Sequence, residues 1–130
     1  MIMRAKHEGN VMVLELEGHL DFETTVQFRE TCKELIDKNG TPRMVISLEK
    51  LKFVGSSGIN QFIRVLKEFN SLTEKPRYCR LSTEFVRIFR AFQTSRNPFE
   101  IFEDESTAKL SFDLPPAPKK PTRVKKVATN

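Results

Sequence analysis

A short apolar run followed by an apolar repeat of helical period limits how this chain can fold more than any other feature. Residues 44–48 read Met-Val-Ile-Ser-Leu, a composition typical of a strand buried in a sheet. Strand and helix must then meet across the loop Gly55-Ser56-Ser57-Gly58. The side chains that recur at helical spacing after this loop are Ile59, Phe62, Ile63, Leu66 and Phe69.

The two serines of this loop have different predicted positions. At about 100° per residue, Ser57 projects about 180° from the mean direction of the apolar side chains, so we expect its hydroxyl to face solvent. Ser56 lies at the flank of the apolar stripe and is predicted to be the helix N-cap. A phosphate on Ser57 would lie at the positive end of the helix dipole, which suits a phosphoacceptor. A plain helix start, in which the serines only cap, is the alternative.

Shorter patterns on both sides predict further strands and helices. Residues 2–7 and 11–17 predict a hairpin, and residues 77–81 and 99–102 predict two more strands. Helices are predicted over residues 24–38, with a Thr24 and Gln27 capping box, after Ser82 and after Asp104. The side chains expected to face inward are Val26, Cys32, Leu35 and Ile36 in the first of these helices, and Phe85, Val86, Phe89 and Phe92 in the next.

Strands that alternate with helices imply parallel pairing through right-handed crossovers. The sequence therefore predicts an α/β fold, a small, mostly parallel mixed sheet of four to five strands with about four helices.

The distribution of charge divides the chain into two parts. The net charge is +5, but the residues after Phe112 carry five basic side chains against Asp113 alone, so residues 1–112 are close to neutral. Residues 1–112 are long enough for one domain. Residues 113–130 also contain four prolines, and we expect a mobile, solvated basic tail. Contact of this tail with nucleic acid or an anionic surface is the alternative.

Common catalytic signatures are missing, including the GxxxxGK[ST] phosphate loop, GxGxxG, HExxH and GxSxG. His7 and His19 are expected at the surface, and Cys32 and Cys79 lack metal-ligand spacing and are expected to be buried free thiols. We therefore predict a protein that is not an enzyme and has no cofactor or metal. The N-terminus lacks an apolar signal region and no stretch approaches the roughly 20 apolar residues of a membrane span, so the expected location is the cytoplasm.

Three motifs together have the pattern of a known family: Gly18-x-Leu20-Asp21, strand 44–48 followed by Leu51-x-Phe53, and Ser56-Ser57-Gly58-Ile59. Ser82 before a third amphipathic helix and the later Phe99-x-Ile101 continue the pattern. With these motifs, residues 2–112 resemble a STAS domain, the family named for sulfate transporters and anti-sigma factor antagonists, and in particular the free-standing bacterial antagonists. The family usually has an acidic residue just before its two hydroxyl residues, where this chain has Gly55.

The resemblance implies a partner switch. The unmodified protein would bind an anti-sigma factor that is also a serine kinase, and phosphorylation of Ser57 would release it; ATP would belong to the kinase. A scaffold that assembles signalling or transport complexes without modification is a second hypothesis, which Gly55 favours, and tethering to nucleic acid by the tail is a third. The expected contact residues are Asp21, Gly55, Ser56, Ser57, Gly58, Asn60, Gln61 and Arg64.

Overall fold

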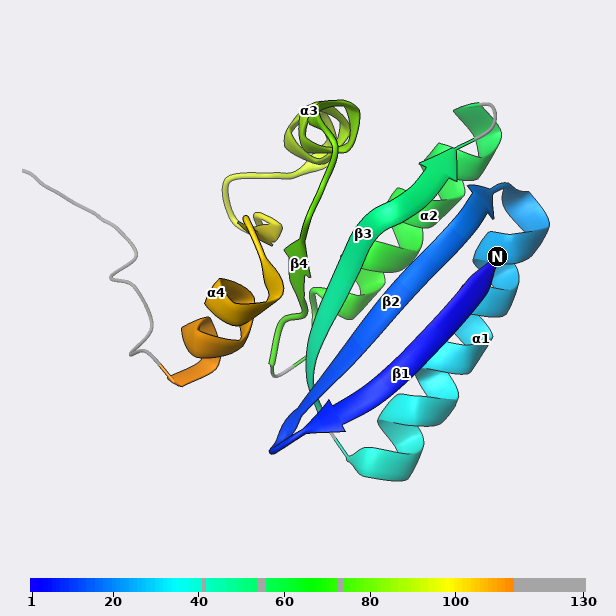
Figure 1. The fold of residues 1–130 in the computed structure, drawn as a ribbon. Coiled ribbons are helices and arrows are strands. Elements are labelled where there is room, and N and C mark those ends of the chain that lie inside the picture. Colours follow the sequence, from blue (N-terminus) through cyan, green and yellow to red (C-terminus); the bar gives the residue numbers. More distant parts are fainter. Residues whose placement is uncertain (41, 54–55, 73, 114–130) are drawn as a thin grey trace, which may run out of the picture.

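A five-stranded sheet with strand order β1-β2-β3-β4-β5 organises the chain (Figure 1). The computed structural model describes residues 1–40, 42–53, 56–72 and 74–113, and for Asn39, Ser56 and Ser57 it describes the backbone only. The strands are β1 (Ile2–Glu8), β2 (Val11–Leu20), β3 (Arg43–Phe53), β4 (Arg77–Cys79) and β5 (Glu100–Phe102). The helices are α1 (Phe22–Asn39), α2 (Ser56–Phe69), α3 (Thr83–Phe92), α4 (Glu105–Leu110) and the 3₁₀ helix η1 (Ser111–Asp113).

Among the strands of the described residues, only the first pair is antiparallel. Strands β1 and β2 form a hairpin, and Gly9 in their turn has a φ of +66°, a conformation that favours glycine. The pairs β2–β3, β3–β4 and β4–β5 are all parallel. Across the described residues, this mixed sheet with four α-helices confirms the predicted fold class.

Strand β3 (Arg43–Phe53) is longer than the predicted strand of residues 44–48. Between the pairs Glu15↔Ser47 and Glu17↔Lys50, β3 contains one residue more than β2, which is a β-bulge. The bulge resets the alternation, so that Leu48 and Leu51 both join the same core cluster. The strand therefore continues to Phe53 although the apolar alternation in the sequence stops at the bulge.

Aromatic rings hold α1, α2 and α3 on one face of the sheet. The Phe28 ring of α1 lies 5.5 Å from the Phe62 ring of α2, measured between centroids, and the Phe85 ring of α3 lies 6.5 Å from Phe62. On the opposite face, Ala108 of α4 and Phe112 of η1 pack with valines of β2 and β3. Both faces of the central strands are thus covered, as expected for parallel strands.

Helix α1 begins earlier than predicted. Asp21 is its N-cap: its Oδ1 accepts a hydrogen bond from the Thr24 N–H at 2.9 Å, and Thr24 Oγ1 accepts one from the Asp21 N–H at 3.0 Å. The predicted capping box of Thr24 and Gln27 is therefore wrong, because Thr24 is the N3 partner of this box and not its first member. Asp21 at the cap makes Phe22 the first residue of the helix.

Two inward-facing predictions are also wrong. Val26 is 40% exposed because the buried stripe of α1 follows Thr25, Phe28 and Cys32, leaving Val26 at its flank. Phe92 is 39% exposed because it is the last residue of α3, where the chain turns away from the core.

The other predictions for these helices agree with the structure. Ser82 caps α3 by accepting from the Phe85 N–H at 3.2 Å, and Asp104 caps α4 by accepting from the Thr107 N–H at 2.8 Å. Phe85 and Phe89 are buried, and so are the free thiols of Cys32 and Cys79. Val86, Leu35 and Ile36 are half-buried, and His7 and His19 are exposed.

The end of the described chain extends one residue into the predicted tail. Asp113 belongs to η1, and its carboxylate lies 3.4 Å from the Arg43 guanidinium. Residues 114–130, on which the prediction of a basic tail depends, lie outside the described residues. Among the helices of the described ranges, none has the length and apolar content to cross a membrane.

Candidate functional site

Two helices begin together at one edge of the sheet, which we call the carboxyl edge. Strands β2 and β3 run parallel and end side by side, with Leu20 opposite Phe53. Helix α1 follows the first strand and α2 follows the second, so the first turns of both helices lie at this edge (Figure 1). Parallel strands therefore bring together segments that are distant in the sequence, as the predicted fold requires.

The first turn of α2 packs directly on the backbone that leads into α1. A Cβ added to Gly58 would lie 2.9 Å from the Asp21 Cα and 3.0 Å from the Leu20 carbonyl oxygen. Real side chains do not approach backbone atoms this closely, so only glycine fits at this position. The backbone of Ser56 and Ser57, in the same turn, is thereby held next to Asp21.

Asp21 presents a fixed negative charge beside this turn. It is exposed, and its carboxylate is oriented by the hydrogen bonds of the α1 cap. The hydrogen bond from the Thr24 backbone N–H, followed by the Thr24 hydroxyl, lowers the pKa of Asp21 below its ordinary value. The carboxylate is therefore ionised at neutral pH.

Of the expected contact residues in α2 whose exposure is described, Asn60 and Arg64 are exposed and Gln61 is half-buried. The opposite face carries the predicted apolar stripe, of which Ile59 is half-buried and the other four members are buried. Arg64 has no ion-pair partner among the described residues.

Three of the predicted site residues fall wholly or partly outside the described atoms. Gly55 lies outside the described residues, and the side chains of Ser56 and Ser57 lie outside them as well. The capping role of Ser56 and the outward direction of the Ser57 hydroxyl therefore remain predictions.

Sequence reasoning missed two exposed apolar residues at the carboxyl edge. Phe22 is 55% exposed and Val26 is 40% exposed, and both belong to the first turns of α1. The available signal was Asp21: once it is recognised as the N-cap, Phe22 becomes the first helical residue and stands one turn from Val26.

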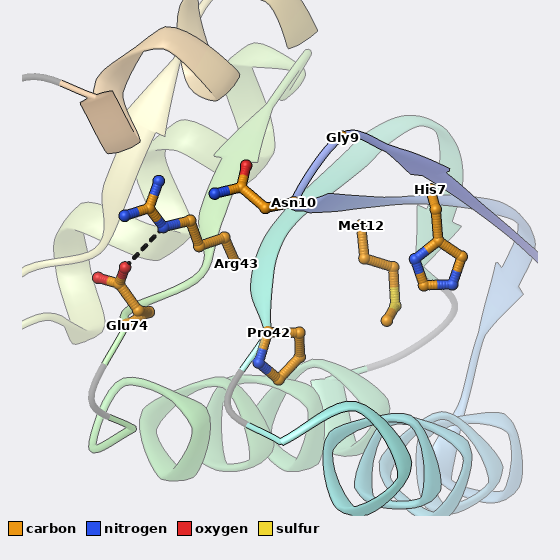
Figure 2. Close-up of a pocket in the computed structure, with 7 residues that line it drawn as sticks. All are labelled: His7, Gly9, Asn10, Met12, Pro42, Arg43 and Glu74. Atoms are coloured by element: carbon orange, nitrogen blue, oxygen red, sulfur yellow. Dashed lines mark hydrogen bonds and ion pairs between the residues drawn. The ribbon is translucent and has the colours of Figure 1, made fainter.

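A hollow of about 380 Å³ lies away from this edge, near the start of β3 (Figure 2). Its lining includes His7, Asn10, Arg43 and Glu74, and none of the predicted site residues. The Arg43 Nε donates to Glu74 at 2.8 Å, so the charge of this guanidinium is already balanced within the protein (Figure 2). Within the described ranges, no three His, Cys, Asp or Glu side chains are placed to hold a metal ion.

Comparison with known proteins gives consistent results. The STAS domain family model matches residues 3–108. An anti-sigma F factor antagonist from Paenibacillus polymyxa is 31% identical over 65 residues, which is 50% of this chain and 56% of that protein. The matched region thus spans only about half the length of this relative.

The fold is shared with solved structures. The anti-sigma factor antagonist SpoIIAA in its unphosphorylated form has a TM-score of 0.61 at 17% identity, over 86% of this chain and 97% of that one. A serine-to-glutamate variant of RsbS from Moorella thermoacetica has a TM-score of 0.65 at 14% identity, over 86% and 98%. At these identities the likeness concerns the fold alone. Because the family model extends from the first hairpin into α4, the chain belongs to the STAS domain family.

Proposed function

We propose that this chain is an anti-sigma factor antagonist that acts as a partner switch and not as an enzyme. With Ser57 unmodified it binds an anti-sigma factor serine kinase, and phosphorylation of Ser57 releases it. The function named for the Paenibacillus relative supports the class of protein, and the carboxyl edge supports the position of the switch. This role belongs in the cytoplasm, where the kinase and the sigma factor act.

The close approach of Gly58 to Asp21 is the observation that carries the proposal. It fixes the turn containing Ser57 beside an ionised carboxylate at an edge where two helices begin. A phosphate would add about −1.5 to −2 charges there. The helix N-terminus tolerates that charge, whereas a partner surface that is acidic or apolar would be repelled or left unpaired. The fold is thus kept while the docking surface changes.

The two thiols lack the properties of a cysteine nucleophile. Burial raises the pKa of Cys32 to about 12 and the pKa of Cys79 to about 11, so both are protonated at neutral pH. A thiol nucleophile instead needs a lowered pKa and access to solvent. The described cysteines are therefore structural.

The test is phosphorylation and binding with each anti-sigma factor kinase of the source organism. After incubation with the purified kinase and Mg-ATP, peptide mass spectrometry should find one phosphate, on Ser57, and none on the matched control Ser57→Ala. Calorimetry should show that Ser57→Ala binds the kinase like the unmodified chain and that Ser57→Asp does not. If Ser57→Asp binds as well as the unmodified chain, the protein is a constitutive scaffold and the switch is refuted.

A further inference from the structure

An ion pair identifies which edges of α1 and α2 face each other. Arg29 of α1 donates from Nε and Nη2 to the two carboxylate oxygens of Glu68 in α2, at 3.0 and 2.9 Å. Phe22 and Val26 share the edge of Arg29, because spacings of seven and three residues place side chains on one side of a helix. Gln61 and Arg64 stand seven and four residues before Glu68, spacings that put them on the edge of Glu68.

The two edges also match along their length. Both helices return from parallel strands, so they run in the same direction and lie side by side (Figure 1). Seven residues before the ion pair, Phe22 and Gln61 therefore occupy corresponding positions. We call the four residues Phe22, Val26, Gln61 and Arg64 the α1–α2 surface. It ends next to the contact between Gly58 and Asp21, the residue before Phe22.

The α1–α2 surface combines exposed apolar side chains with a guanidinium that has no ion-pair partner among the described residues. Single exposed apolar residues are ordinary, but here Phe22 and Val26 are 55% and 40% exposed one helical turn apart. Beside them Arg64 has no ion-pair partner among the described residues. Apolar side chains next to an available guanidinium are characteristic of protein interfaces.

We infer that Phe22 and Val26 are the apolar anchor through which this chain binds its anti-sigma factor kinase, with Arg64 paired to a carboxylate of that partner. The inference rests on the proposed function. A partner that responds to Ser57 must cover more than one helical turn, because stable interfaces bury about 800 Å² on each side. The α1–α2 surface is continuous with the Ser57 turn, and its charge calls for an acidic group opposite Arg64.

The experiment measures the Kd of the full chain for the kinase that binds it in the preceding test. A non-hydrolysable ATP analogue keeps Ser57 unmodified during the titration. Phe22→Ser and Val26→Ser should each weaken binding about tenfold or more. The matched controls Phe92→Ser and Leu110→Ser truncate side chains that are 39% and 61% exposed elsewhere, and should change Kd less than about twofold. Thermal unfolding of each variant establishes that it is folded.

The outcomes separate this inference from the proposed function. If Phe22→Ser and Val26→Ser bind like the wild type while Ser57→Asp does not bind, the anchor is refuted and the switch stands. If no kinase binds the wild-type chain, both fail. If sedimentation shows a dimer of the wild type that Phe22→Ser dissociates, the surface joins two copies of this chain and the inference is overturned.

Discussion

Gly58 and Asp21 lie in backbone contact, with only 2.9 Å between the Asp21 Cα and the position of a Cβ on Gly58. The contact joins the first turn of α2 to the N-cap of α1, directly beyond the paired ends of β2 and β3. Three elements therefore fix the position of the Ser57 backbone: the two strand ends and the α1 cap.

Gly58→Ala should destabilise the protein although alanine is the better helix former. An added methyl cannot avoid the Asp21 backbone, and overpacking of this kind costs about 1 to 3 kcal/mol. Without the clash, the substitution would gain up to about 1 kcal/mol of helix propensity. Denaturant unfolding measures whether the substitution lowers or raises the free energy of unfolding. Asn60→Ala, on the exposed face of the same helix, should be close to neutral, and a stable Gly58→Ala protein would contradict the contact.

The charge of the Asp21 cap should appear as a pH dependence of stability. Hydrogen bonds from Thr24 hold the pKa of Asp21 below its unfolded value of about 3.9, so the folded state favours the ionised form. The resulting stabilisation is present above the unfolded pKa and is lost as pH falls through the folded pKa. Wild type should therefore exceed Asp21→Asn in stability at neutral pH, and the two should converge in strong acid.

Unfolding of both proteins in urea between about pH 2 and pH 7 measures this difference. Asp37→Asn is the matched control, because it removes a carboxylate from the far end of α1, where a negative charge opposes the helix dipole. It should not lower stability at neutral pH. A constant difference between wild type and Asp21→Asn at every pH would show that the charge of the cap contributes nothing.

The sequence predicts the alternation of strands and helices and the orientation of α2. Both can be predicted because the residues that these elements bury are apolar and recur at regular spacing in the sequence. It also predicts the caps at Ser82 and Asp104, where the capping residue directly precedes an apolar repeat. Asp21 is not predicted as the cap of α1, because Thr24 is also a good capping residue and local pattern does not rank the two. The predicted helix therefore begins at Thr24 and omits Phe22.

Other features depend on contacts between distant segments. The bulge of β3 is visible only against the register of β2, and the closeness of Gly58 to Asp21 arises from parallel pairing and not from either local sequence. The exposure of Val26 and Phe92 likewise could not be predicted from local sequence. An apolar residue at the flank of a helical stripe, or in its last turn, is buried only if a neighbouring element covers it.

Arg80→Gly should stabilise the protein. Arg80 has a φ of +56°, in the left-handed region that costs a non-glycine residue about 1 kcal/mol or more. Its ion pair with Glu49 is long, at 3.9 Å, and about half exposed, so its loss costs little. We expect a gain of about 0.5 to 1 kcal/mol in denaturant unfolding. Arg80→Ala keeps the strain and loses the same ion pair, so it should show no gain; equal stabilities of the two variants would contradict a strained backbone.

The thiols of Cys32 and Cys79 should be unreactive in the native protein. Both side chains are buried, so a reagent cannot reach either sulfur in the folded protein. Burial also raises the pKa of each thiol, so the reactive thiolate does not form at neutral pH. Labelling with a chromogenic disulfide at neutral pH should report no fast-reacting thiol in native conditions and two in denaturant. Rapid labelling of one thiol before unfolding would show that its strand or helix opens locally.

Tyr78→Phe should raise stability, the opposite of most core substitutions. The Tyr78 side chain is fully buried between the rings of Phe89 and Phe99, and its hydroxyl has no hydrogen-bond partner among the described residues. Burial of an unpaired hydroxyl costs about 1 to 3 kcal/mol, and phenylalanine keeps the ring contacts while removing that group. Denaturant midpoints of wild type and Tyr78→Phe measure the difference, with Tyr78→Leu as the control that loses the ring and should be less stable. A loss of stability in Tyr78→Phe would mean that a bound water satisfies the hydroxyl, because only a hydrogen bond made in the folded state gives this group a favourable contribution.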